Sequence, residues 1–151
     1  MNKNLASALL GAALCVSGAA IANDAASLRA SGAWIRVMPA NLPAGGYVAL
    51  ENAGDTPVTL TAASSPAFGH AMIHRSSTDG GMGRMETVHS VTLPPHASTA
   101  FAPGGYHVML TDAVKPLTIG DKVPVTFTLG DGSTLPVDFI ARPANATGPT
   151  D

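Results

Sequence analysis

Residues 123–139 read VPVTFTLGDGSTLPVDF, and this stretch decides the fold. Apolar side chains alternate with threonine and proline up to Leu129, and the alternation resumes at Leu135 after Gly130-Asp131-Gly132. Because successive side chains of a strand point to opposite faces, this period of two predicts two strands that each bury one face. A short glycine-rich segment between them predicts a hairpin turn.

The same alternation recurs through the preceding hundred or so residues, with turn residues roughly every eight to twelve positions. The earlier segments with this pattern are Trp34–Val37, Gly46–Leu50, Val58–Ala62, His70–His74, Met85–Val91, Thr99–Phe101 and Tyr106–Leu110. No stretch after residue 22 carries a convincing helical stripe. The sequence therefore predicts one all-β domain of about eight or nine short strands, an antiparallel β-sandwich with Greek-key connections.

The first 22 residues have the pattern of a secretory signal peptide. Lys3 precedes the apolar stretch Leu5–Ile21, and Ala20-Ile21-Ala22 forms an A-x-A cleavage box. Serine and glycine dilute the stretch, which favours export over a membrane-spanning helix. Cys15 suggests a lipoprotein, but Leu14 stands where lipoprotein signals have a small residue. We expect cleavage after Ala22, export to the bacterial periplasm and no stable membrane insertion afterwards.

Composition limits what the chain can be. Its 151 residues are enough for one domain, which we place at residues 23–140, and 46% of them are hydrophobic, which argues against disorder. Charged residues make up 12% and the net charge is −2, so nothing indicates a nucleic-acid partner. The small, polar tail at 141–151 is predicted to be disordered.

Cysteine usage excludes several kinds of site. The chain has one cysteine, Cys15, and it lies inside the predicted signal peptide. A disulfide framework, a thiolate zinc site and a CxxC redox centre are therefore excluded, as is a blue-copper centre, which needs a cysteine ligand.

Histidine and methionine share one face of several predicted strands. In Tyr106–Leu110, the apolar alternation leaves His107 and Met109 on the face away from the core. The segment His70–His74 repeats this pattern with two histidines and Met72 on one face. A bland alternative is that Met109 covers the edge of a second core.

These side chains have a common chemistry. Thioether sulfur is soft and neutral and selects Cu(I) or Ag(I) over zinc and magnesium, and imidazole adds affinity. A zinc enzyme would show three histidine or carboxylate ligands and an open position. The donors therefore favour binding of Cu(I) without catalysis, and we expect no enzyme; no G-x-S-x-G motif is present either.

The spacing of four residues resembles a known family. His74, Met85, His107 and Met109 form an H-x10-M-x21-H-x-M pattern, similar to the signature of the PCu(A)C periplasmic copper chaperones. The segments that also resemble this family, in family order, are Ala33–Arg36, Gly46–Asn52, Pro103–Leu110 and Gly120–Val123.

The resemblance covers about Ser31 to Phe139 and implies specific properties. The fold would be a cupredoxin-like Greek-key β-sandwich, and the four residues of the pattern would bind Cu(I). The protein would be a monomer that delivers copper towards the copper centre of a respiratory cytochrome oxidase, through an oxidase subunit or an assembly factor.

The chain departs from the family pattern in places. Arg75 stands where many members have methionine after the first histidine, and Met82 precedes Met85 by one position more than usual. We expect Met72 and Met82 to be core or rim residues and Met38 to serve packing or a loop. The further expectations are His70 as a neighbour of the site, His89 and His96 as surface residues, and Trp34 in the core.

Two other functions remain open at the level of sequence. A secreted β-sandwich for adhesion or assembly would carry the histidines and methionines incidentally. A periplasmic copper buffer for resistance would use the same site without a dedicated acceptor.

Overall fold

The computed structural model describes residues 23–39 and 42–150, and most of them form β-strands, as predicted. The predicted signal peptide, residues 1–22, lies outside the described residues. Two short 3-10 helices are η1 (Asp24–Ser27) and η2 (Asp79–Gly81). The strands are β1 (Leu28–Arg36), β2 (Ala44–Asn52), β3 (Val58–Ser64), β4 (Phe68–Ser77), β5 (Arg84–Thr87), β6 (Val91–Leu93), β7 (Ala97–Phe101), β8 (Tyr106–Ala113), β9 (Lys122–Leu129) and β10 (Thr134–Arg142).

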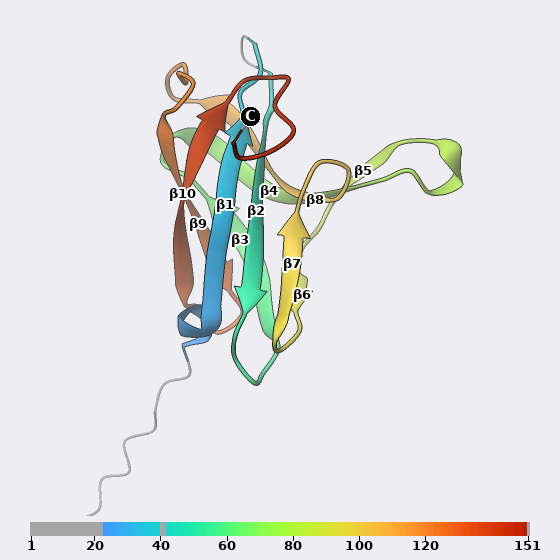
Figure 1. Cartoon of the computed structure of the whole chain (residues 1–151), viewed down its shortest axis with the longest axis vertical. Coiled ribbons are helices and arrows are strands. Elements are labelled where there is room, and N and C mark those ends of the chain that lie inside the picture. The colour runs from blue at the N-terminus through green and yellow to red at the C-terminus, as the bar shows by residue number, and fades with distance from the viewer. Residues whose placement is uncertain (1–22, 40–41, 151) are drawn as a thin grey trace, which may run out of the picture.

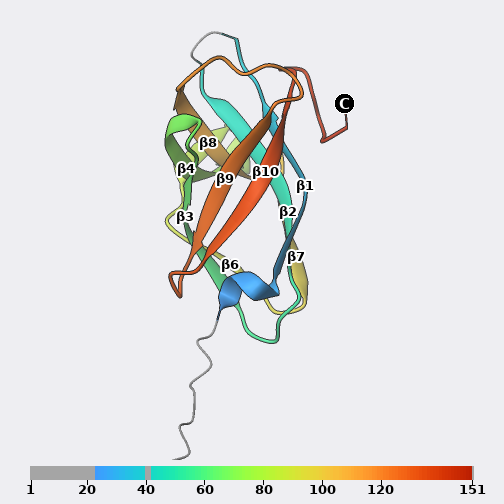
Figure 2. The same ribbon diagram turned by 90° about the vertical axis from the view of Figure 1, so that its left-hand side faces the viewer.

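The strands pair in the order β5-β4-β8-β7-β2-β1-β10-β9-β3-β6, and β8 also pairs directly with β2. This sheet curves back on itself, so that β3 lies against β4 and the layers enclose one core (Figures 1 and 2). Most neighbours are antiparallel, as predicted, whereas β1–β10 and β7–β8 are parallel. The strands β1 and β10 lie at the two ends of the domain's sequence. Nearly the whole domain therefore forms the long connection between these two parallel strands.

The hairpin predicted from residues 123–139 is the β9–β10 hairpin. Phe127 lies opposite Leu135, and Val125 lies opposite Val137. Gly132 adopts a φ of 83°, a left-handed conformation that glycine tolerates without steric cost.

One predicted strand is wrong. Residues 85–91 form two strands: β5 pairs with β4 at one edge of the sheet, whereas β6 pairs with β3 at the other. The chain leaves β5 at Val88, whose backbone N–H donates to the carbonyl of Ile73. No glycine or proline marks this break in the sequence, so no local turn signal separates the two strands. The β4–β5 hairpin consequently projects from the body of the sandwich (Figure 1).

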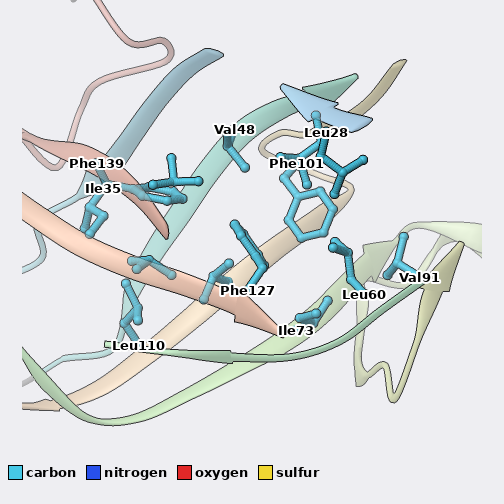
Figure 3. Packing of buried hydrophobic residues seen from close by; sticks show 14 of the residues in the cluster. Leu28, Ile35, Val48, Leu60, Ile73, Val91, Phe101, Leu110, Phe127 and Phe139 are labelled. Carbon is cyan, nitrogen blue, oxygen red and sulfur yellow. The ribbon is translucent and has the colours of Figure 1, made fainter. Parts of the chain in front are cut away.

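The inward faces of the strands build the core, and Figure 3 shows these side chains meeting between the layers. Phe127 packs against Phe101 and Phe139, with ring centroids 6.0 and 6.5 Å apart. Burial of each large apolar side chain stabilises the fold by about 1.5–3 kcal/mol. Asn52 is buried as well, and its side-chain amide donates to the carbonyls of Thr56 and Leu93.

The prediction of a disordered tail from residue 141 is also wrong for the residues described. β10 continues through Arg142, and Ala146 is buried in a small second cluster with Trp34 and Tyr47. The Arg36 guanidinium donates to the carbonyl of Ala146 from Nε at 3.1 Å and from Nη2 at 2.7 Å. Trp34 is buried, as expected, but in this outer cluster, together with Ala146 of the tail.

Replacement of the buried Ala146 by aspartate is expected to expel the tail from Trp34. Burial of a carboxylate in this aromatic cluster would cost at least about 1–3 kcal/mol, because a polar group leaves water without a matching hydrogen bond. The tail is therefore expected to leave the cluster. Because Trp34 is the only tryptophan, its fluorescence emission should shift to the red while the far-UV β-sheet spectrum is retained. The exposed neighbour Ala144 provides the control Ala144→Asp, and identical emission from both variants would contradict the observed packing.

Candidate metal centre

The face of the sheet opposite the core gathers the predicted ligands into adjacent rows. His74 on β4 lies directly opposite His107 on β8, and Met72 lies directly opposite Met109. Since side chains alternate along a strand, all four share one face. Val108, between the two β8 residues, is fully buried in the core. The predicted division of β8 into an apolar face and a His/Met face is thus observed.

His107 is fixed with one nitrogen available. Its Nδ1 lies 3.1 Å from the carbonyl oxygen of Gly105. Because a carbonyl only accepts, Nδ1 carries the proton and Nε2 keeps its lone pair. Such a bond is what orients a metal-binding imidazole. The side chain is only 5% exposed, so the ring is held by its surroundings.

His74 carries an unsatisfied nitrogen. Its Nδ1 is buried and has no hydrogen-bond partner, whereas Nε2 lies 3.3 Å from Oγ1 of Thr87 on β5. The rings of His74 and His107 are 5.7 Å apart and nearly perpendicular. Burial lowers the pKa of His74, and the neighbouring His107 lowers it further. The neutral imidazole, which is the form that binds metals, is therefore favoured here.

A hollow of about 290 Å³ opens beside these histidines. Its lining includes Met85, His107 and Met109, three of the four predicted ligands, together with Met38 and Tyr47. Met85 comes from the projecting β4–β5 hairpin and is 56% exposed, whereas Met109 is half-buried. The fourth predicted ligand, His74, does not line the hollow but lies next to His107. These residues therefore lie together, and their role as ligands stays a prediction.

The remaining candidates lie outside the hollow. Met72 is 40% exposed and Met82 is 68% exposed, so both are rim or surface residues. His70 faces Asp112, with Nε2 and Oδ2 3.7 Å apart. Nε2 of His96 lies 2.7 Å from Oδ1 of Asp55 at the surface, where this histidine was expected.

The wall formed by β2 was not recognised in the sequence. Gly45 lies opposite Met109, and a Cβ on Gly45 would come within 2.7 Å of the Tyr47 hydroxyl oxygen. Glycine at this position therefore lets the tyrosine ring lie beside the hollow. That ring is 6.3 Å from the ring of His107 and 4.6 Å from the ring of Trp34. Only the pairing of β2 with β8, a contact distant in sequence, places this wall here.

Other metal chemistry finds little support in the described part of the chain. Residues 23–39 and 42–150 contain no group of three or more histidine, cysteine and carboxylate side chains placed to hold a metal ion. Among the same residues, no helix has the length and apolar character needed to cross a membrane.

Comparison with known proteins identifies relatives along most of the domain. The family model described as "Putative lipoprotein LpqE-like" matches residues 28–141. "Putative lipoprotein Lxx21020" of Leifsonia xyli subsp. xyli is 32% identical over 115 residues, which cover 76% of this chain and 69% of that protein. "Uncharacterized protein RP573" of Rickettsia prowazekii is 30% identical over 88 residues, which span 58% of this chain and about half (49%) of that protein.

Solved structures share the fold. The apo PCuAC domain from PmoF1 superposes with a TM-score of 0.64 at 29% identity, covering 78% of this chain and 94% of that domain. The solution structure of CuI-DR1885 from Deinococcus radiodurans gives 0.62 at 30% identity, covering 77% and 78%. The copper-bound PCuAC domain from PmoF2 gives 0.65 at 22% identity over 78% and 93%, which speaks for the fold alone. The predicted cupredoxin-like Greek-key β-sandwich is confirmed.

Cu(I) binding at this face is expected to weaken as the pH falls from 7.5 to 5. Protons compete for the imidazoles, and because the pKa of His74 is lowered from 6.5, that residue loses its lone pair only at more acidic pH. The unfolded chain takes up this proton more readily than the folded protein, so apo stability also decreases as the pH falls through about 6.5. Competition titrations across this range, with a chelator calibrated at each pH, measure the effect. An affinity independent of pH would contradict ligation by histidine.

Proposed function

Since the chain belongs to the LpqE-like family, whose matched region here has the PCuAC fold, we propose that it is a periplasmic Cu(I)-binding metallochaperone. The observation that carries this proposal is the clustering on one sheet face. His74 and His107 lie side by side, and His107 shares a hollow with Met85 and Met109. These are the four residues of the H-x10-M-x21-H-x-M pattern.

The donor set suits Cu(I). Two neutral imidazoles and two thioethers add no charge to a monovalent ion, and sulfur donors select it over harder cations. The buried, unpaired Nδ1 of His74 and the free Nε2 of His107 supply the nitrogen lone pairs. The Cu(I)-bound structure of DR1885 from Deinococcus radiodurans, a protein 30% identical to this chain over the aligned residues, supports Cu(I) as the cargo.

The gradient of exposure from histidine to methionine favours transfer over permanent storage. His107 is nearly inaccessible, whereas Met85 stands 56% exposed on the projecting hairpin. An acceptor's ligands would therefore displace the Met85 thioether first, while the histidines still hold the ion. Thioethers suit this exchange because they require no proton to leave.

We propose export to the periplasm with removal of residues 1–22 after Ala22. The relatives described as lipoproteins support an envelope location. Leu14 before the only cysteine, Cys15, favours simple cleavage over lipid attachment in this chain.

The proposed destination of the copper is the copper centre of a respiratory cytochrome oxidase, reached through an oxidase subunit or an assembly factor. The support for this is the resemblance of the sequence pattern to the periplasmic chaperones. A copper buffer that uses the same site without a dedicated acceptor is the second candidate.

Titration of the mature chain, residues 23–151, with Cu(I) against a colorimetric chelator is expected to give one tight equivalent. His107→Gln and Met109→Leu should each weaken binding by about 100-fold or more, because even an outer-shell change costs roughly 10–100-fold. Met82→Leu is the matched control, since Met82 is exposed and outside the hollow. If the folded protein binds no Cu(I), the chain returns to the metal-free adhesion or assembly sandwich. If all variants bind Cu(I) alike, the assignment of His107 and Met109 as ligands is contradicted.

Deletion of the gene distinguishes delivery from buffering. A strain without this protein is expected to lose cytochrome oxidase activity when copper is scarce and to regain it when copper is added. The complementing control carries the wild-type gene, and a gene encoding His107→Gln should fail to complement. Normal oxidase activity combined with sensitivity to excess copper would instead identify a buffer.

A further inference from the structure

We propose that Met38 is an additional sulfur ligand of this site, so that the hollow offers Cu(I) or Ag(I) three thioethers beside the imidazole of His107, and that Met38 and Met85 alternate as the fourth ligand when both histidines and Met109 bind. This inference rests on the proposed function, because it concerns the same metal. It adds a residue that lies outside the H-x10-M-x21-H-x-M pattern and that the sequence indicated only as a packing or loop residue.

The position of Met38 carries the inference. It lines the hollow together with Met85, His107 and Met109. These side chains reach it from the end of β1, from the β4–β5 hairpin and from β8. Neither Met72 nor Met82 lines this hollow, so the three methionines that share it are a distinct set among the five after residue 22.

Met38 does not belong to either buried cluster of the described residues. The side chain is half-buried but belongs neither to the main core nor to the apolar residues packed against it. It also lies outside the second cluster around Trp34. Met38 lies between two hollows, an apolar one that it shares with Leu42 and Leu110 and the one that holds two other thioethers.

The backbone on both sides holds Met38 at the hollow. The N–H of Val37 donates to the carbonyl of Arg142 at 2.9 Å. This bond extends the pairing of β1 with β10 to Val37, the residue before Met38. The Arg36 guanidinium is bonded to the Ala146 carbonyl and lies 5.5 Å from the ring of Tyr47. Pro39 follows with its φ restricted. Met38 is therefore presented from a fixed strand end.

A third thioether changes how the site exchanges its ion. Met38 and Met109 belong to the body of the sandwich, whereas Met85 belongs to the projecting, fully exposed strand β5. When an acceptor displaces Met85, the other two thioethers and His107 still hold the ion. Met38 thus keeps Cu(I) bound during the exchange, and its loss would make release faster and binding weaker.

Nuclear magnetic resonance of methionine methyl groups tests this directly. The mature chain, labelled with [methyl-13C]methionine, gives signals for Met38, Met72, Met82, Met85 and Met109, each assigned by a methionine-to-leucine variant. Addition of Ag(I), a redox-inert probe with the same ligand preference, should shift three of them, Met38, Met85 and Met109, with saturation at one equivalent. The signals of Met72 and Met82 should stay in place.

The outcomes separate this inference from the proposed function. Shifts of Met85 and Met109 without Met38 would overturn the role of Met38 and leave the chaperone proposal standing. No shift of any methionine would contradict the chaperone proposal itself.

The variant Met38→Leu supplies the second readout. It keeps the apolar volume but removes the sulfur. It should weaken Cu(I) binding by about tenfold or more relative to Met82→Leu, because even the loss of a residue that only supports a ligand costs about 10–100-fold in affinity. Thermal unfolding of the apo variant checks that the fold is intact. A Met38 signal that shifts while Met38→Leu binds Cu(I) as tightly as the wild type would also overturn the assignment.

Discussion

The register between β4 and β8 is the constraint on which the site depends. It sets His74 opposite His107 and, one row away, Met72 opposite Met109. A slip by one residue would turn every one of these side chains into the core. The buried residues between them, among them Val108, forbid that slip, because they would have to leave the core in exchange. The core therefore positions the face that carries these histidines and methionines, although none of the candidate ligands belongs to the apolar core.

A small aromatic cluster next to His107 completes the arrangement. The outer face of β1 and β2 carries a small aromatic cluster in which Tyr47 stacks on Trp34 and stands beside His107. The C-terminal segment covers this cluster, and Arg36 ties it down through the carbonyl of Ala146. The buried His107 on one side and the exposed Met85 on the other are the arrangement that the chaperone proposal requires.

Local patterns explain what could be predicted from the sequence. The β9–β10 hairpin and the two faces of β8 depend on alternation within a few residues, and both are observed. The division of residues 85–91 between opposite edges of the sheet depends on distant pairing that no local signal marks. The packed tail and the approach of Met38 and Tyr47 to the hollow likewise require the fold. The placement of the four pattern residues is observed, and their ligation stays a prediction.

X-ray absorption at the copper K edge of the Cu(I)-loaded protein tests the central claim most directly, because it identifies the atoms bound to the ion. The proposed site predicts a Cu(I) edge with both sulfur and imidazole nitrogen in the first coordination shell. Since the chain has no cysteine after residue 22, any sulfur ligand in the mature protein must be methionine. A first shell of nitrogen and oxygen without sulfur would contradict the assignment of this face as a thioether-imidazole copper site.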